Sequence, residues 1–223
     1  MSHRPIRAVL FDLDGTLLDT APDLVRVLNL VRVEQGRAPL PYETARAQVS
    51  HGSTGLIRLG FPDVAGDPLE RLRLRLLELY SQRLAVGTQL FAGCRKVLDA
   101  LAERGIPWGI VTNKPGYLTV PLLAQLKLAD EAGSVVSGDT LPQRKPHPAP
   151  LLLAASQLSI PAPDCLYVGD AERDVQSARA AGMPVLVARY GYLGPDDDPH
   201  LWQPDALIDD PQQILDWLDG TLT

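Results

Sequence analysis

The sequence predicts an α/β fold, a doubly wound parallel sheet with an inserted α-helical cap domain. Short apolar runs alternate with helical patterns over most of the 223 residues, and this alternation is typical of a parallel sheet with helices on both faces. Residues 18–88 break the alternation, because they carry helical patterns without a convincing strand. We therefore expect a core of residues 1–17 and 89–223 and a helical cap domain of residues 18–88.

The strands of the core are predicted from five compact apolar runs. These runs cover residues 7–11, 108–111, 135–137, 165–168 and 184–188. The helical patterns between them cover residues 93–104, 118–128, 148–158 and 171–181. Gly182 is a stop signal for the last of these helices. In such sheets the reactive residues lie beyond the carboxyl ends of the strands, so the polar residues directly after each apolar run are the candidates for a site.

Two long helical patterns make up most of the cap region. The first covers residues 23–35 and the second residues 68–84, where leucines recur at helical spacing among arginines and glutamates. Hinges between cap and core are expected at residues 18–22 and 87–93. The alternative is that these helices belong to one continuous fold.

The composition limits the partners and the compartment. A hydrophobic content of 45% is enough for a sizeable core, and a net charge of -6 gives no basic surface for a nucleic acid or an anionic membrane. Cys94 and Cys165 are too far apart in the chain for a disulfide framework or a zinc site, so both are predicted as buried apolar residues in a reducing compartment. Asp12 and Asp14 interrupt the first apolar run, which excludes a signal peptide or membrane span there and favours a cytoplasmic location.

Asp12 and Asp14 form the first group of candidate site residues. They follow a predicted strand at positions i and i+2, a spacing that turns both side chains toward one face of an extended chain. Two carboxylates this close repel each other, so they need a bound cation, a shared proton or a partner lysine. The alternative is that they are ordinary turn residues.

Asp170 and Asp174 form the second group. Gly169 allows a sharp turn after the strand, and a parallel sheet would then present Asp170 at the same edge as Asp12. Asp174 lies one helical turn further on and faces the same way, where it would hold Asp170 or a metal-bound water. Asp170 as a helix N-cap is the alternative.

Two further segments at the same sheet edge offer groups that bind phosphate. Thr112, Asn113 and Lys114 follow one strand, and Lys145 precedes a proline at the start of a helical segment. A hydroxyl, backbone N–H groups and an ammonium together suit a dianionic phosphate. Taken alone, Lys145 is equally well read as a surface residue.

The four segments resemble the motifs of the haloacid dehalogenase-like superfamily in order and rough spacing. They are Asp12–Leu17, Thr112–Asn113, Lys145–Pro146 and Gly169–Asp170 with Asp174. The resemblance covers almost the whole chain, and it implies the α/β core and helical cap already expected.

Shorter stretches resemble particular phosphatases of this superfamily. Residues 18–23 and 112–115 are similar to phosphatases of the phosphoglycolate phosphatase type with a helical cap. Residues 49–52 and 190–192 are similar to the related N-acetylmuramic acid 6-phosphate phosphatases of cell-wall (peptidoglycan) recycling. The resemblance therefore implies carbohydrate metabolism and leaves two substrates open, with a slight preference for the sugar phosphate.

The resemblance also implies a magnesium-dependent hydrolysis of phosphomonoesters. Asp12 would be the nucleophile that forms an aspartyl-phosphate, and Asp14 the acid and base. Asp12, Asp170 and the backbone carbonyl of Asp14 would bind Mg²⁺, whose oxygen preference fits this set.

The same resemblance assigns the remaining polar residues of the sheet edge. Thr112, Asn113 and Lys145 would bind the phosphate, and Lys145 would also offset the negative charge around Asp12. Asp174 takes a supporting role.

The part of the substrate beyond the phosphate is expected to be read by the cap. The polar segment of residues 50–54 lies just before an apolar helix and is the candidate specificity loop. His51 and Ser53 are its candidate contacts with a carboxylate or a sugar hydroxyl. The alternative is that His51 is an exposed loop histidine or part of an N-capping segment.

Three other functions compete with a phosphatase acting on a small phosphorylated metabolite. A phosphosugar mutase of the same superfamily would transfer the phosphoryl group instead of releasing it. A catalytically silent binding module would keep the fold alone, whereas every expected catalytic position is occupied here. A dehalogenase does not need a second acid at Asp14 or a metal-binding Asp170. The sequence makes no prediction of the oligomeric state.

Overall fold

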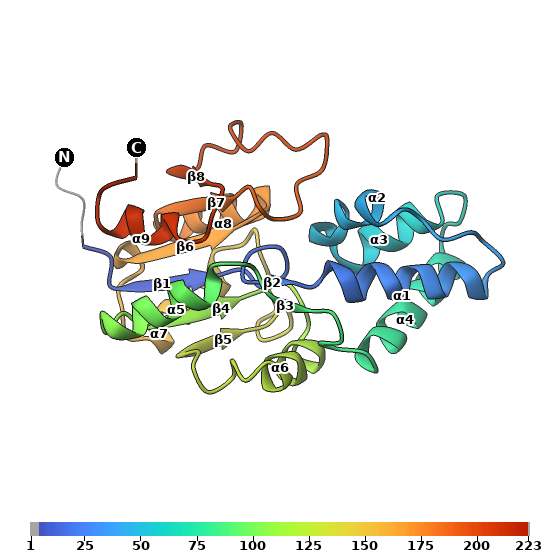
Figure 1. The fold of residues 1–223 in the computed structure, drawn as a ribbon, viewed down its shortest axis with the longest axis horizontal. Coiled ribbons are helices and arrows are strands. Elements are labelled where there is room, and N and C mark those ends of the chain that lie inside the picture. Colours follow the sequence, from blue (N-terminus) through green and yellow to red (C-terminus); the bar gives the residue numbers. More distant parts are fainter. Residues whose placement is uncertain (1–4, 223) are drawn as a thin grey trace.

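A six-stranded parallel sheet forms the centre of the computed structural model, which describes residues 5–222 (Figure 1). The strand order is β5-β4-β1-β6-β7-β8, and every neighbouring pair is parallel. The strands are β1 (Ala8–Phe11), β4 (Trp108–Val111), β5 (Ser134–Val136), β6 (Cys165–Gly169), β7 (Val185–Ala188) and β8 (Ala206–Ile208). The chain therefore adds β4 and β5 on one side of β1 and later β6 to β8 on the other. This reversal of direction occurs beside β1, and sheets of this kind bind ligands at the carboxyl ends of the strands next to such a reversal.

Helices cover both faces of the sheet. They are α5 (Cys94–Glu103), α6 (Gly116–Gln125), α7 (Ala149–Gln157), α8 (Glu172–Ala181) and α9 (Gln213–Leu218). Val9 and Phe11 of β1 pack in the apolar cluster that includes α5, whereas Ala8 and Leu10 pack in the cluster that includes α7 and α8. Alternate strand residues thus enter different layers, as the predicted doubly wound fold requires.

Residues 18–88 form a group of helices beside the sheet (Figure 1). They are α1 (Ala21–Glu34), α2 (Tyr42–Arg46), a 3₁₀ turn (Val49–His51), α3 (Gly52–Gly60) and α4 (Asp67–Ser81). The buried side of α1 carries its predicted apolar positions and packs against α3 and α4. The assignment of residues 18–88 as a separate domain stays a prediction.

A two-stranded ribbon lies where the chain leaves and re-enters the core. β2 (Leu18–Asp19) pairs antiparallel with β3 (Gln89–Leu90), inside the two predicted hinge segments. The expectation that residues 18–88 contain no strand was therefore wrong for residues 18 and 19. Two residues are too few to show an alternation of apolar and polar side chains, so such a strand is recognised only from its pairing in the structure.

Asp23, a few residues after β2, joins the two chain segments that connect the core with residues 18–88. Its buried carboxylate accepts hydrogen bonds from the backbone N–H groups of Gly87 and Thr88 and from the Thr88 hydroxyl, at 2.7–2.9 Å. The start of α1 is thereby tied to the segment that precedes β3.

Both cysteines are buried and unpaired, as predicted. Within residues 5–222, no helix combines the length and the apolar character needed to cross a membrane.

Candidate functional site

Three neighbouring strands bring the predicted site residues to one edge of the sheet. Asp12, Thr112 and Asp170 directly follow β1, β4 and β6, which are adjacent in the sheet. Lys145 enters the same place from the segment before α7, and Asp174 enters from the first turn of α8. All five side chains are buried.

Lys145 lies at the centre of this cluster. Its Nζ is 2.8 Å from Asp12 Oδ1 and 2.7 Å from Asp174 Oδ1, and it also donates to the Tyr167 hydroxyl at 2.8 Å. Tyr167 in turn donates to the carbonyl of Val111 at 3.0 Å. The ammonium is completely buried, so the surface-residue alternative for Lys145 does not hold. A strongly hydrated charge is buried at this depth only when it is paired.

Asn113 holds the segment that carries Lys145. Its side-chain amide donates to the Lys145 carbonyl at 2.9 Å and accepts from the Lys145 N–H at 3.0 Å. Both amide atoms are therefore engaged with backbone, which makes Asn113 a positioning residue in this arrangement. The Thr112 hydroxyl accepts from the Lys114 N–H at 3.1 Å and keeps its own proton available.

Asp14 turns away from the cluster and toward the helices of residues 18–88. Its Oδ1 is 2.8 Å from Lys114 Nζ and accepts a hydrogen bond from the Thr20 hydroxyl at 2.6 Å. Lys114 also donates to the hydroxyl of Tyr80, on α4, at 3.0 Å. Each carboxylate of the predicted pair thus has its own lysine, Lys145 for Asp12 and Lys114 for Asp14.

Asp170 is held by residues from two distant segments. Its Oδ2 accepts hydrogen bonds from the Tyr192 N–H at 3.0 Å and from the Ser50 hydroxyl at 2.6 Å. The first turn of α8 is capped instead by Asp174, whose Oδ2 accepts from the Ala171 N–H at 3.0 Å. The N-cap alternative for Asp170 is therefore wrong.

A metal ion fits between Asp12 and Asp170. Asp12, Asp170 and Asp174 each offer an oxygen within 4.8 Å of the others. Lys145 and a backbone N–H already occupy both oxygens of Asp174. Among the described residues, no donor lies closer than 3.5 Å to Asp170 Oδ1, and none is seen for Asp12 Oδ2. Two free carboxylate oxygens in an all-oxygen surrounding suit a hard cation such as Mg²⁺.

The electrostatics of the cluster favour a cation at the same position. Burial raises the pKa of Asp170 to about 7, and the charges of Asp12 and Asp174 add to the effect. Burial and Asp174 also raise the pKa of Asp12, while Lys145 opposes them. A bound cation would remove the repulsion among these carboxylates.

The predicted specificity segment starts as a 3₁₀ turn and continues as α3. Ser50 reaches Asp170, as described above. His51 is exposed, and it provides no side-chain cap for α3. Ser53 is half-buried, and its hydroxyl accepts a hydrogen bond from Arg73 of α4 at 3.4 Å. The structure thus brings Ser50 to the carboxylates and leaves His51 on the surface.

Several contacts at the site were not predicted from the sequence. Tyr167 and Tyr80 stand among apolar residues and gave no signal of a polar role. Ser50 belongs to the predicted specificity segment, but its contact with Asp170 and that of Tyr192 join positions far apart in the chain. Only the fold brings such pairs together. The sequence signal for Tyr167 is its hydroxyl within an otherwise apolar strand, since a buried hydroxyl needs a partner.

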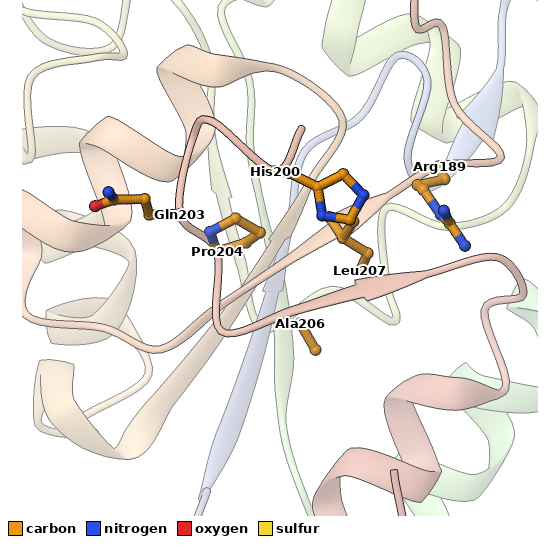
Figure 2. Close-up of a pocket in the computed structure, with 6 residues that line it drawn as sticks. All are labelled: Arg189, His200, Gln203, Pro204, Ala206 and Leu207. Atoms are coloured by element: carbon orange, nitrogen blue, oxygen red, sulfur yellow. The ribbon is translucent and has the colours of Figure 1, made fainter. Parts of the chain in front are cut away.

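The open groove of about 400 Å³ beside β7 and β8 belongs to another part of the surface (Figure 2). Arg189, His200 and Leu207 are among its lining residues, and none of the clustered aspartates lines it. Arg189 is paired with Asp209. Figure 2 therefore shows a surface hollow without the acid, base or metal-binding groups of the site.

Comparisons with known proteins agree with this geometry. The sequence model of the haloacid dehalogenase-like hydrolases matches residues 9–188. A phosphoglycolate phosphatase of Xanthomonas campestris pv. campestris (strain 8004) is 45% identical over 208 residues, which cover 93% of this chain and 94% of that protein. An N-acetylmuramic acid 6-phosphate phosphatase of Pseudomonas aeruginosa strain PAO1 is 38% identical over 223 residues, covering 100% of this chain and 99% of that protein.

Solved structures agree as well. The crystal structure of a predicted phosphoglycolate phosphatase from Haemophilus somnus 129pt superposes with a TM-score of 0.84 at 25% identity, over 95% of this chain and 97% of that one. The family match spans the sheet edge from Asp12 to Asp174. The chain belongs to the haloacid dehalogenase-like hydrolases, as a member of their phosphatase branch.

Proposed function

We propose that the protein is a magnesium-dependent phosphomonoesterase that hydrolyses a small phosphorylated metabolite through an aspartyl-phosphate. The observation that carries the proposal is the buried Lys145 ammonium shared by Asp12 and Asp174, with Asp170 beside them. This arrangement combines a nucleophile, a cation for phosphate oxygens and two free carboxylate oxygens for a metal.

Asp12 is the nucleophile of this proposal. Its carboxylate oxygen forms a bond to phosphorus while the bond from phosphorus to the leaving oxygen breaks, and Asp14 gives its proton to that oxygen. A water then attacks the aspartyl-phosphate and loses a proton to Asp14, and the bond between Asp12 and phosphorus breaks to release inorganic phosphate. Asp14 starts the cycle protonated and ends it protonated.

The metal would be held by Asp12, Asp170 and the backbone carbonyl of Asp14. When bound, Mg²⁺ supplies positive charge to the phosphoryl oxygens and keeps the two carboxylates ionised. Asp174 positions Lys145 from the opposite side and stays out of the metal site, because both of its oxygens are already engaged.

Phosphate binding falls to Lys145 and Thr112. The Lys145 ammonium faces Asp12, where the transferred group arrives, and the Thr112 hydroxyl has a free proton to donate. Asn113 contributes by fixing the Lys145 backbone. Positioning of this kind supplies much of the acceleration of phosphoryl transfer.

The helices of residues 18–88 are proposed as a cap that closes over the site and reads the leaving group. The Ser50 contact with Asp170 supports this role, and His51 and Ser53 follow it directly. The two kinds of full-length relative supply the candidate substrates, 2-phosphoglycolate and N-acetylmuramic acid 6-phosphate. The ratio of kcat/KM for these two compounds decides between them.

The decisive experiment is the hydrolysis of p-nitrophenyl phosphate with Mg²⁺ by the Asp12→Asn variant. We expect no measurable turnover with an intact fold by circular dichroism, because an amide does not replace the attacking carboxylate. Asp130→Asn removes an exposed carboxylate from the surface and serves as the matched control with normal activity. Full activity in Asp12→Asn would refute the mechanism. Release of free phosphate from a sugar phosphate, rather than its isomerisation, separates a phosphatase from a mutase.

A further inference from the structure

Arg173 is a half-buried arginine for which the described chain provides no hydrogen-bond or ion-pair partner. It lies in the first turn of α8, and its Nε is enclosed without an acceptor. A guanidinium carries five N–H donors, and a buried donor without an acceptor is costly. An arginine that served only the fold would be expected to be paired.

The helix directs Arg173 toward the segment that carries Lys145. Ser177 lies four residues further along α8, on the same face, and its hydroxyl donates to the His147 carbonyl at 2.9 Å. His147 is two residues from Lys145. Arg173 is one turn closer to the N-terminus of α8, which is the end at the site, and it lies on the same face of the helix as Ser177.

The charge of Arg173 reaches the reacting groups. Burial alone would lower the pKa of Arg173, but the carboxylates of Asp174, Asp12 and Asp170 raise it. In return, Arg173 opposes the rise in the pKa of Asp12. The guanidinium is thus part of the electrostatic surroundings of the nucleophile without being bonded to it.

The two lysines near the site already have protein partners. Lys145 is divided between Asp12 and Asp174, and Lys114 between Asp14 and Tyr80. Arg173 differs because its Nε has no acceptor within residues 5–222. It is therefore equipped for an incoming anion, and its planar fork matches two oxygens of one phosphate.

We propose that Arg173 binds the non-bridging oxygens of the substrate phosphate, opposite the nucleophile and beside Lys145. This inference rests on the proposed phosphatase function and adds a second cationic residue to its phosphate site. A dianionic monoester offers several charged oxygens to Lys145 and Arg173 together, whereas a phosphodiester offers one charge and fewer free oxygens. The product, inorganic phosphate, binds to the same two cations.

The test measures inorganic phosphate rather than turnover alone. The dissociation constant of phosphate is determined by calorimetry with Mg²⁺ present, together with its competitive inhibition constant and the KM for p-nitrophenyl phosphate. In Arg173→Met we expect each constant to rise by about tenfold or more, as for the loss of a charge-assisted bidentate contact. Arg173→Lys keeps the charge without the fork, so it should fall between wild type and Arg173→Met. Arg179→Met, on the same helix but exposed and paired with Asp205, is the matched control with unchanged constants.

The outcomes separate this inference from the proposed function. A wild-type protein that neither hydrolyses p-nitrophenyl phosphate nor binds phosphate would overturn the proposed function. An active wild type with unchanged phosphate binding in a folded Arg173→Met would overturn the role of Arg173 alone. If Arg173→Met does not fold, Arg173→Lys decides: weaker phosphate binding supports the proposal, and unchanged binding overturns it.

Discussion

The two aspartates that follow β1 contact different lysines and therefore lie in different surroundings. Asp12 shares Lys145 with Asp174 inside the sheet edge, whereas Asp14 and Lys114 face Tyr80 of α4. One carboxylate therefore lies inside the sheet edge, and the other lies at the boundary with the helices of residues 18–88. In the proposed mechanism, this places the nucleophile within the sheet edge and the proton donor next to those helices.

The pKa of Asp170 predicts how Mg²⁺ stabilises the protein at different pH values. Burial raises this pKa to about 7, above the usual 3.8, so the metal-free folded state binds more protons than the unfolded state between these values. The free energy of unfolding of the metal-free protein should then fall as the pH rises through that window. Bound Mg²⁺ removes the penalty, because it favours the ionised carboxylate.

Thermal unfolding with Mg²⁺ and with a chelator measures this effect. We expect the Mg²⁺-dependent rise in Tm to be small near pH 5 and to grow until the pH passes about 7. In Asp170→Asn the rise should be small at every pH. An equal rise in wild type at pH 5 and pH 8 would contradict the assignment of Asp170 as a ligand.

The sequence was sufficient to predict those site residues that directly follow a strand or precede a helix. Asp12, Asp170 and Lys145 follow strands or enter helices at one sheet edge, and parallel topology is enough to bring them together. Arg173 gave no such signal, because an arginine between acidic residues at a helix start is ordinarily a solvated one. The carboxylates of Asp12 and Asp170 that act on its charge belong to other strand ends, and only the fold brings them near Arg173.

Among the connecting segments, two glycines allow the loops around Asp170 to approach closely. Gly15 has φ +89°, and a Cβ there would collide with the Asp170 carboxylate. A Cβ at Gly191 would lie 2.5 Å from Asp170 Cβ and also against the Gly15 carbonyl. The turn after β1 and the segment before Tyr192 thus hold Asp170 only because both positions lack a side chain.

Gly191→Ala should therefore damage the site more than the fold. The added methyl group must displace Asp170, and a shift of about 1 Å at a reacting group costs about 100-fold in rate. Gly182→Ala is the matched control, since Gly182 has φ +72° at the end of α8 with open space around it. We expect Gly182→Ala to lose about 1 kcal/mol of stability with normal activity.

Steady-state assays and urea unfolding of both variants check this contrast. Equal activity in the two variants would show that the close approach to Asp170 is unimportant.

The periodic elements were predicted well, and the short ones were not. The predicted helix over residues 171–181 is α8 (Glu172–Ala181), and the apolar run at 165–168 is β6. β8 and α9, near the C-terminus, were not predicted, since three residues of strand and six of helix carry too little periodicity. β8 forms because β7 offers it an edge to pair with, and α9 forms where Ile214 packs in the apolar core.

At the scale of the whole molecule, polar contacts at the site and near the hinge connect the sheet to the helices of residues 18–88. Ser50 bonds to Asp170 and Lys114 to Tyr80 at the site, and the Tyr192 hydroxyl donates to Asp19 at 2.7 Å near the hinge. Hydrogen bonds of this kind exchange readily with water, whereas an apolar interface of the same extent would not separate easily. Buried apolar residues of the sheet and of the helices of residues 18–88 also form one continuous cluster, so any movement of these helices would have to separate apolar contacts as well as polar ones.

Asp23 is the residue whose removal tests whether the cap is a separate unit. Its carboxylate ties Gly87 and Thr88 to the start of α1, where the chain crosses between the two parts. In Asp23→Ala the half-buried N–H of Gly87 and the buried N–H and hydroxyl of Thr88 lose their acceptor, so the free energy of unfolding should fall by about 2–4 kcal/mol. Asp63→Ala removes an exposed partner of Arg37 within the cap and should change stability little.

The shape of the unfolding curve then distinguishes one continuous fold from a core with an inserted cap. If the helices of residues 18–88 are a separate cooperative unit, Asp23→Ala should divide the transition in two, because the crossings no longer couple the units. Fluorescence of the three tryptophans, Trp108, Trp202 and Trp217, follows the core because all lie outside residues 18–88, and far-ultraviolet circular dichroism follows all helices. Midpoints that separate between the two signals support the inserted cap, and coincident midpoints in this variant would favour one continuous fold.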